Sequence, residues 1–258
     1  MFGASKPARR LKERTDMYGK LGRVGVATPF GGEIIISDMY RYLHPDIQVA
    51  EVPILFKKLT KEGLEELSGK VVEGMSNFPL SFPIDLAYFS CTTGSQIGGA
   101  GFDKKMCEAM KSAAQSRGAL TTTTALLQAL RAVGSKKLSI VTPYPDEIND
   151  MEKAYLEHEG FQVVSINGIK TENPTNPMLI TKIPEERTFD FALRYVSGQA
   201  DTLLISCCGL HSMSLPAALE KKIGIPVLTS NQCAVWAVGK FFGAHGPKAQ
   251  ELGSLFDK

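Results

Sequence analysis

Short apolar runs alternate with longer amphipathic stretches along the whole chain of 258 residues. This alternation is typical of βα units, in which parallel strands buried on both faces are covered by helices. We therefore predict an α/β fold. The predicted strands lie at residues 23–28, 47–54, 86–90, 137–142, 162–166, 202–206 and 226–229.

Amphipathic helices are predicted between these strands. Residues 60–75 place leucine, valine and methionine side chains at three- and four-residue spacings, opposite charged side chains. The same spacing at residues 103–114 puts Cys107 in a core-facing stripe. Because buried free cysteines are usually inert, we expect Cys107 to be structural.

Two proline-rich segments punctuate the second half of the chain. Pro143 and Pro145 end one strand and open the next helix, which fixes Tyr144 at the carboxyl end of that strand. Residues 167–184 are rich in Asn, Pro, Gly and Thr and form the longest predicted loop. This loop is either a lid or a plain connector.

Two of the apolar runs match each other and end in cysteine. The runs close at Cys91 and Cys207, and each has an aspartate six residues before its cysteine, Asp85 or Asp201. A serine stands immediately before each cysteine, and a small polar loop follows it. Two thiols in equivalent places suggest a two-fold-related pair that faces one substrate.

The composition narrows the class of partner. Lysine and arginine total 29 and the acidic residues 27, a formal net charge of +2. This balance favours neither nucleic acid nor an acidic membrane as partner. We expect a small molecule, or another subunit in a homo-oligomer.

The cysteines and histidines do not indicate a metal site. The five cysteines form no CxxC pair, and neither they nor the four histidines show the spacings of zinc ligands. An odd cysteine count without a secretory signal predicts a reducing compartment, so we expect a cytoplasmic protein. Residues 1–19 are predicted to be a basic solvated tail. No later segment approaches the roughly 18 apolar residues that a membrane span needs.

The predicted chemistry gathers at the carboxyl ends of the strands, where open α/β sheets bind ligands. Cys91, Tyr144, Cys207 and residues 229–231 all fall there. The helix that follows each strand offers free amide groups, which favour a thiolate and bind a carboxylate. With thiols on opposite faces of a carbon, one removes a proton while the other delivers one. Alternatively, one thiolate adds to a carbon–carbon double bond, which permits rotation before elimination.

Each of these residues also has a structural interpretation. Cys91 and Cys207 are small enough to serve as core residues at buried strand ends. Cys208 follows Cys207 directly, and strand alternation predicts that one of the two points away from the cleft. The six-residue spacing from Asp201 selects Cys207. His211 acts either as a base beside the second cysteine or as a surface or capping residue.

Five motifs together resemble the aspartate/glutamate racemase superfamily, in the branch that contains maleate cis-trans isomerases and arylmalonate decarboxylases. The resemblance spans nearly the whole chain. The motifs lie at residues 25–29 (GVATP), 91–95 (CTTGS), 142–149 (TPYPDEIN), 205–210 (ISCCGL) and 224–231 (GIPVLTSN).

The resemblance implies two similar four-stranded, flavodoxin-like domains with the active site in the cleft between them. They would comprise residues 20–118 with 230–258, and residues 119–229. It also implies chemistry without a cofactor, on a small carboxylate substrate. By position, Cys91 and Cys207 resemble the catalytic cysteines, and the other site residues resemble substrate-binding or cleft-lining positions. These are Pro29, Thr92, Thr93, Tyr144, Cys208 and Gly209.

Cys91 distinguishes between the two activities of this branch. Arylmalonate decarboxylases look similar along much of the chain but carry glycine at the place of Cys91, so the resemblance favours an isomerase or racemase. A decarboxylase that needs only Cys207, and a non-catalytic carboxylate-binding protein, are the alternatives. After Pro29 the maleate isomerases have a Ser-rich turn ending in Asn, whereas this chain has Phe30-Gly31-Gly32. We therefore expect a pocket suited to a bulky or aromatic acid.

Overall fold

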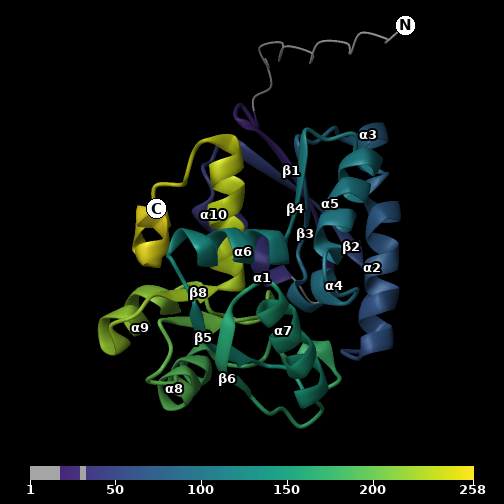
Figure 1. Ribbon diagram of the computed structural model, residues 1–258. Helices are drawn as coiled ribbons and strands as arrows, with labels where there is room; N and C mark the ends of the chain where they lie inside the picture. The colour runs from purple at the N-terminus through teal and green to yellow at the C-terminus, as the bar shows by residue number, and fades with distance from the viewer. Residues whose placement is uncertain (1–17, 30–32) are drawn as a thin grey trace, which may run out of the picture.

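The computed structural model describes residues 18–29 and 33–258. Most of the predicted tail, residues 1–17, and the turn at residues 30–32 lie outside the described residues. The described chain forms two layered α/β halves, one above the other in Figure 1. None of its helices combines the length and apolar character that a bilayer crossing requires.

The first sheet has four parallel strands in the order β2-β1-β3-β4. Helices on both faces and at the strand ends accompany it. The elements are β1 (Gly22–Pro29), α1 (Glu33–Tyr42), β2 (Ile47–Ile54), α2 (Lys61–Met75), α3 (Phe78–Ser81), β3 (Leu86–Phe89), α4 (Thr92–Gln96), α5 (Phe102–Ala113), β4 (Gly118–Thr121) and α6 (Thr122–Ala132).

The second sheet repeats this order as β6-β5-β7-β8, again with parallel strands. Its elements are β5 (Lys137–Thr142), α7 (Asp146–His158), β6 (Gln162–Gly168), η1 (Pro177–Leu179), α8 (Glu185–Tyr195), β7 (Thr202–Ile205), α9 (Leu215–Ile223), β8 (Val227–Thr229), α10 (Ser230–Phe242), η2 (Ala249–Leu252) and η3 (Ser254–Asp257). The predicted pair of four-stranded parallel sheets is therefore confirmed. In both sheets the strand order reverses at the central pair, where such folds bind ligands.

The repeated aspartates fasten the cysteine-bearing strands to their neighbours. Asp85, before β3, accepts a hydrogen bond from the amide of Arg23 in β1 at 2.8 Å. Asp201, before β7, accepts one from the amide of Lys137 in β5 at 3.0 Å. The matched spacing in the sequence thus reflects a structural contact repeated in each half.

The first sheet extends further along the chain than predicted. β4 was absent from the predicted strands, and it crosses the predicted domain boundary between residues 118 and 119, because Leu86 to Phe89 pair with Gly118 to Thr121. Its sequence GALT is short and lacks the β-branched apolar residues that mark a buried strand. Pairing with β3, rather than local propensity, makes it a strand.

The last long helix, α10, returns from the second sheet to the first (Figure 1). Thr229 begins it with a reciprocal capping box to Gln232. At its other end the ring of Phe241 lies against Gly118, and that of Phe242 against Gly22, where a Cβ would clash with the rings. The two halves are therefore joined by α6 and by α10, which pack together.

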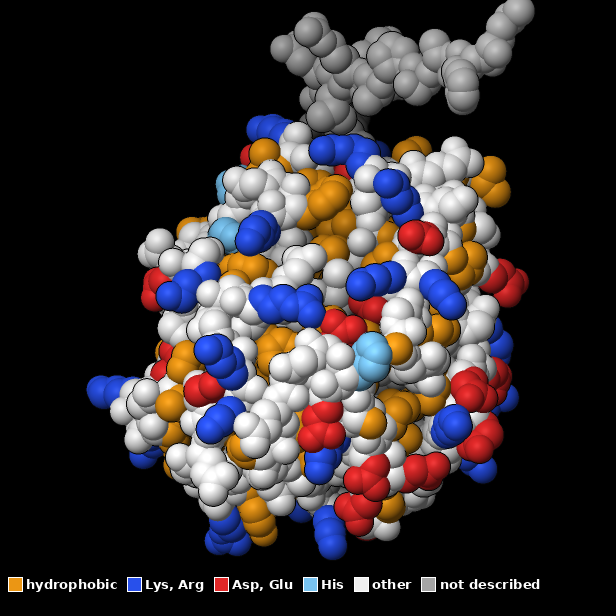
Figure 2. Space-filling model, viewed as in Figure 1, with side chains coloured by type: hydrophobic (Ala, Val, Ile, Leu, Met, Phe, Trp, Pro, Cys, Tyr) orange, Lys and Arg blue, Asp and Glu red, His pale blue; other side chains and the backbone are white. Residues whose placement is uncertain are grey.

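The surface carries no large field of one sign on the face seen in Figure 2. Basic and acidic side chains are interspersed across that face. This distribution agrees with the small net charge of +2.

We expect Asp85→Ala to lower the free energy of unfolding by about 1–3 kcal/mol, because the Arg23 amide loses this acceptor in a largely dry environment. Asp201→Ala should cost less than about 1 kcal/mol, since water replaces the half-exposed Asp201 carboxylate. Urea denaturation of the two variants beside the unsubstituted protein checks this difference. A larger loss for Asp201→Ala would contradict it.

Candidate active site

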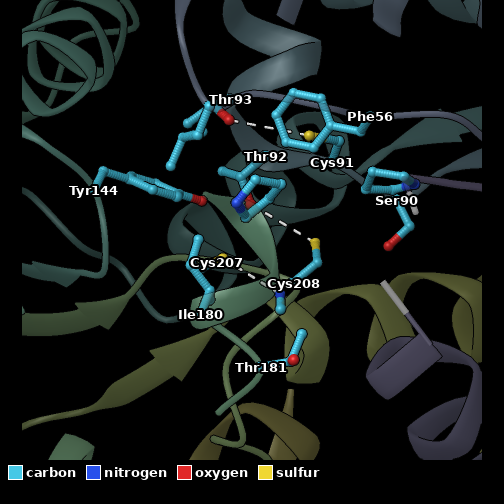
Figure 3. A pocket seen from close by; sticks show the side chains of 14 residues that line it. Phe56, Ser90, Cys91, Thr92, Thr93, Tyr144, Ile180, Thr181, Cys207 and Cys208 are labelled. Atoms are coloured by element: carbon cyan, nitrogen blue, oxygen red, sulfur yellow. Dashed lines mark hydrogen bonds between the residues drawn. The ribbon is translucent and has the colours of Figure 1, made fainter. Parts of the chain in front are cut away.

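One cleft receives side chains from both halves of the chain (Figure 3). Its empty volume, with the open mouth included, is about 450 Å³. Every residue predicted for the site lies on its wall. The lining residues are Pro29, Phe56, Leu59, Ser90, Cys91, Thr92, Thr93, Tyr144, Pro177, Ile180, Thr181, Cys207, Cys208 and Gly209.

Cys91 is the first of the two thiols. It is the N-cap of α4, and its Sγ accepts the amide hydrogen of Gly94 at 3.3 Å. Thr93 places its hydroxyl 4.0 Å from the same sulfur. A Cβ on Gly94 would lie 3.0 Å from this sulfur, so glycine permits the close approach of the α4 backbone.

Cys207 receives a similar set of donors from the second half. Its Sγ accepts the amide hydrogen of Gly209 at 3.3 Å. The hydroxyl of Tyr144, fixed between β5 and α7, interacts with this thiol and lowers its pKa, against the larger effect of burial. Each cysteine therefore has one backbone donor and one hydroxyl neighbour.

Cys208 also lines the cleft, so the prediction that one of Cys207 and Cys208 points away is wrong. Strand β7 ends at Ile205, and the alternation of a strand does not apply beyond it. The Cys208 sulfur lies 3.3 Å from the Thr122 hydroxyl and 3.7 Å from that of Thr92. Three thiols therefore meet in one cleft.

Thr92 connects the cleft to α10. Its hydroxyl lies 3.0 Å from that of Ser230, in the first turn of the helix. The next residue, Asn231, donates its amide to the carbonyl of Cys208 at 3.3 Å. Residues 229–231 thus support the cleft from behind, although they are absent from its wall.

Burial keeps the thiols protonated. It raises the pKa of Cys91 to about 12, with a further increase from the neighbouring Cys208. It also raises the pKa of Cys207 and of Cys208. No lysine, arginine or histidine lines the described wall, so no cation offsets the loss of water. The unliganded site is therefore neutral at neutral pH.

The wall is divided by chemical character. Hydroxyl groups of Ser90, Thr92, Thr93, Tyr144 and Thr181 offer hydrogen bonds to a carboxylate. Apolar side chains cover the remaining wall, namely Pro29, Phe56, Leu59, Pro177 and Ile180. The wall therefore combines hydrogen-bonding groups with apolar surface.

The longest predicted loop lies over the cleft. Its residues Pro177, Ile180 and Thr181 line the wall, and the carbonyl of Thr175 accepts the amide hydrogen of Leu59 at 2.8 Å. It therefore reaches across to the first half. Ile180 and Leu59 were not predicted as lining residues, because their position depends on the path of two loops.

His211 and Cys107 lie outside the described wall of the cleft. The Nε2 of His211 is 3.1 Å from the carbonyl oxygen of Thr181, and the residue is exposed. His211 therefore contacts the loop at residues 167–184 rather than a thiol of the cleft. Cys107 lies 3.5 Å from the Thr124 hydroxyl, in a packing position. Within the described chain, no group of three His, Cys, Asp or Glu side chains is arranged for a metal ion.

Comparison with known proteins places the chain in one family. The model of the arylmalonate decarboxylase family matches residues 26–256. The arylmalonate decarboxylase of Bordetella bronchiseptica is 24% identical over 237 residues, 91% of this chain and 96% of that protein. The maleate isomerase of Nocardia farcinica is 23% identical over 225 residues, 84% of this chain and 88% of that protein.

A solved structure shows the same fold. It is a mutant of the Nocardia farcinica maleate cis-trans isomerase with a covalently bound succinylcysteine intermediate. The TM-score is 0.79 at 20% identity, over 86% of this chain and 93% of that chain. The predicted resemblance to the branch of maleate isomerases and arylmalonate decarboxylases is confirmed.

We expect iodoacetamide to label Cys91 slowly at pH 7, with a rate that rises about tenfold for each pH unit up to pH 10. Below a pKa of about 12, the reactive thiolate fraction grows by that factor per unit. Peptide mass spectrometry measures the rate, and urea-unfolded protein is the control. A plateau in the folded protein below pH 9 would disprove the raised pKa.

Proposed function

The chain belongs to the arylmalonate decarboxylase family, and we propose that it is a cofactor-independent isomerase or racemase of a small carboxylic acid. Cys91 and Cys207 form its thiol pair. The observation that carries this proposal is the meeting of the two thiols in one cleft, each supplied by a different half. A decarboxylase needs one proton donor, whereas a racemase needs one on each side of the reacting carbon.

The substrate carboxylate binds to the hydroxyl groups of the cleft. Thr92, Thr93 and Tyr144 provide neutral donors in a site that excludes water. Preorganised donors of this kind stabilise the charge that moves onto the carboxylate oxygens when the α-carbon loses its proton. They hold the acid in place and lower the barrier at the same time.

Proton transfer then uses the two thiols in turn. One cysteine first releases its proton to bulk water; as thiolate it takes the α-proton and becomes a thiol again, and the electron pair moves onto the carboxylate. The other cysteine returns a proton to the opposite face of the carbon and becomes the thiolate. The stereocentre is inverted and one thiolate remains. Because burial raises the pKa of both thiols, each thiolate is a strong base once formed.

The same pair supports isomerisation about a double bond. A thiolate adds to one alkene carbon, and the other cysteine delivers a proton to the second carbon. After rotation about the new single bond, the second cysteine, now a thiolate, takes that proton back while the first leaves as thiolate, which gives the other isomer. The covalent succinylcysteine in the Nocardia farcinica isomerase structure is an intermediate of this chemical type.

The apolar wall narrows the chemical class of the substrate. Phe56, Leu59 and Ile180 offer a dry surface, and the described wall contains no cation for a second carboxylate. We therefore expect an acid with an aryl or alkyl substituent to be a better substrate than maleate. Equal turnover of maleate, with no turnover of substituted acids, would contradict this preference.

We expect Cys91→Ser and Cys207→Ser each to reduce deuterium incorporation with inversion at the α-carbon by at least about 10³-fold. A serine hydroxyl is a much weaker acid than a thiol, and it cannot serve as the base or the proton donor on its face. Proton NMR of candidate acids in heavy water measures this exchange. Cys107→Ser, which alters a packing cysteine, is the matched control and should retain exchange. If both site variants remain active, the thiol-pair mechanism is wrong.

Decarboxylation of a substituted malonate is the second candidate, favoured by the family match and by the Bordetella bronchiseptica relative. This reaction would use Cys207 alone to protonate the carbanion left by carbon dioxide. It predicts carbon dioxide release that survives Cys91→Gly and is lost in Cys207→Ser. Substrate binding without exchange or release would instead identify a non-catalytic carboxylate-binding protein.

A further inference from the structure

Glu152 is a buried carboxyl that the proposed chemistry leaves unexplained. It lies on the inner face of α7 and is 0% exposed. Its Oε1 accepts a hydrogen bond from the Ser206 hydroxyl at 2.5 Å. Its Oε2 has no hydrogen-bond partner among the described residues. A buried carboxyl with so few partners is costly, which indicates a role beyond packing.

The surroundings of Glu152 contain no compensating charge. The two elements most closely packed against α7, α4 (TTGSQ) and β6 (QVVSING), have no charged residue. Burial raises the pKa of Tyr144, and the neighbouring Cys207 and Glu152 raise it further. Tyr155, one turn along α7, donates to Asp103. Burial raises the pKa of Glu152 to about 7, and its Oε1 can accept the Ser206 hydrogen bond in either protonation state.

Ser206 directly precedes Cys207, and Cys208, which follows it, is also held by a hydrogen bond. The carbonyl of Cys208 accepts a hydrogen bond from Asn231, whose amide also donates to Asp38 at 2.8 Å. The segment of the second cysteine is therefore held on both sides of its thiol. Ser90, the equivalent residue before Cys91, faces Cys208 in the cleft instead of a carboxyl.

We propose that Glu152 is a positioning residue for the reaction, which fixes the place of the Cys207 thiol through the hydroxyl of Ser206. Cys91 has a separate support, since its thiol caps the first turn of α4. The hydrogen bond from Ser206 is the contact that ties Glu152 to the cleft, so we expect its effect to fall on the segment of Cys207. This role deepens the proposed function and rests on the use of Cys207.

Peptide-resolved alkylation at pH 9, with Cys91 as internal reference, tests the contact. Glu152→Ala and Ser206→Ala should each change the labelling rate of Cys207 relative to Cys91 by at least about threefold, equivalent to about half a pKa unit. Glu152→Gln keeps an acceptor oxygen, so its relative labelling rate of Cys207 should remain within about twofold of that of the unsubstituted protein. Glu147→Gln, the same change on the exposed face of α7, is the matched control. The variant that combines Glu152→Ala with Ser206→Ala should change this relative rate no more than either single variant.

Turnover supplies a second measurement. In the deuterium-exchange assay, kcat should fall in Glu152→Ala and recover in Glu152→Gln, while KM changes little. The proposal would be overturned if the labelling rates of both cysteines changed equally or if neither changed. It would also be overturned if Glu152→Gln behaved like Glu152→Ala. If Glu152→Ala does not fold, Ser206→Ala decides, since it removes only one hydroxyl. Selective labelling effects in a protein that turns over no acid would refute the proposed function and leave the contact established.

Discussion

Parallel pairing at the centre of each sheet determines where the cysteines of the cleft lie. The amide of Ser90 continues the β1–β3 ladder to Ala27 at 2.9 Å, and that of Ser206 continues the β5–β7 ladder to Val141 at 2.8 Å. The next residue in each case is a cysteine of the cleft. A slip of one residue in either ladder would shift that thiol by about 3.3 Å along the strand direction. The chemistry of the cleft therefore depends on strand register.

Exclusion of water has two opposing effects in this cleft. It suppresses ionisation of the thiols, so the resting site holds little nucleophile. It also strengthens each hydrogen bond that the hydroxyl groups make to a developing anion. A site that uses neutral donors and buried thiols therefore depends on the bound acid, rather than on a nearby cation, to make charge transfer favourable.

Sequence patterns predicted the parts of the site that follow directly from strand ends. Cys91, Tyr144 and Cys207 were found because a buried strand and a helix start fix such positions locally. Phe56 and Ile180 were not found, since they reach the cleft through loops whose course depends on tertiary contacts. The side of Cys208 was misjudged because the strand ends earlier than predicted. Glu152 did carry a signal, since it falls on the apolar stripe of its helix with Ile148 and Tyr155.

The return of α10 to the first half has a consequence for the order in which the protein is made. Gly22 and Gly118 of the first sheet lie under the rings of Phe242 and Phe241, which are synthesised after the whole second sheet. The second sheet, by contrast, is complete once β8 has been made. During translation the later half can therefore finish folding before the earlier one. The first sheet must wait with an uncovered surface until α10 has left the ribosome.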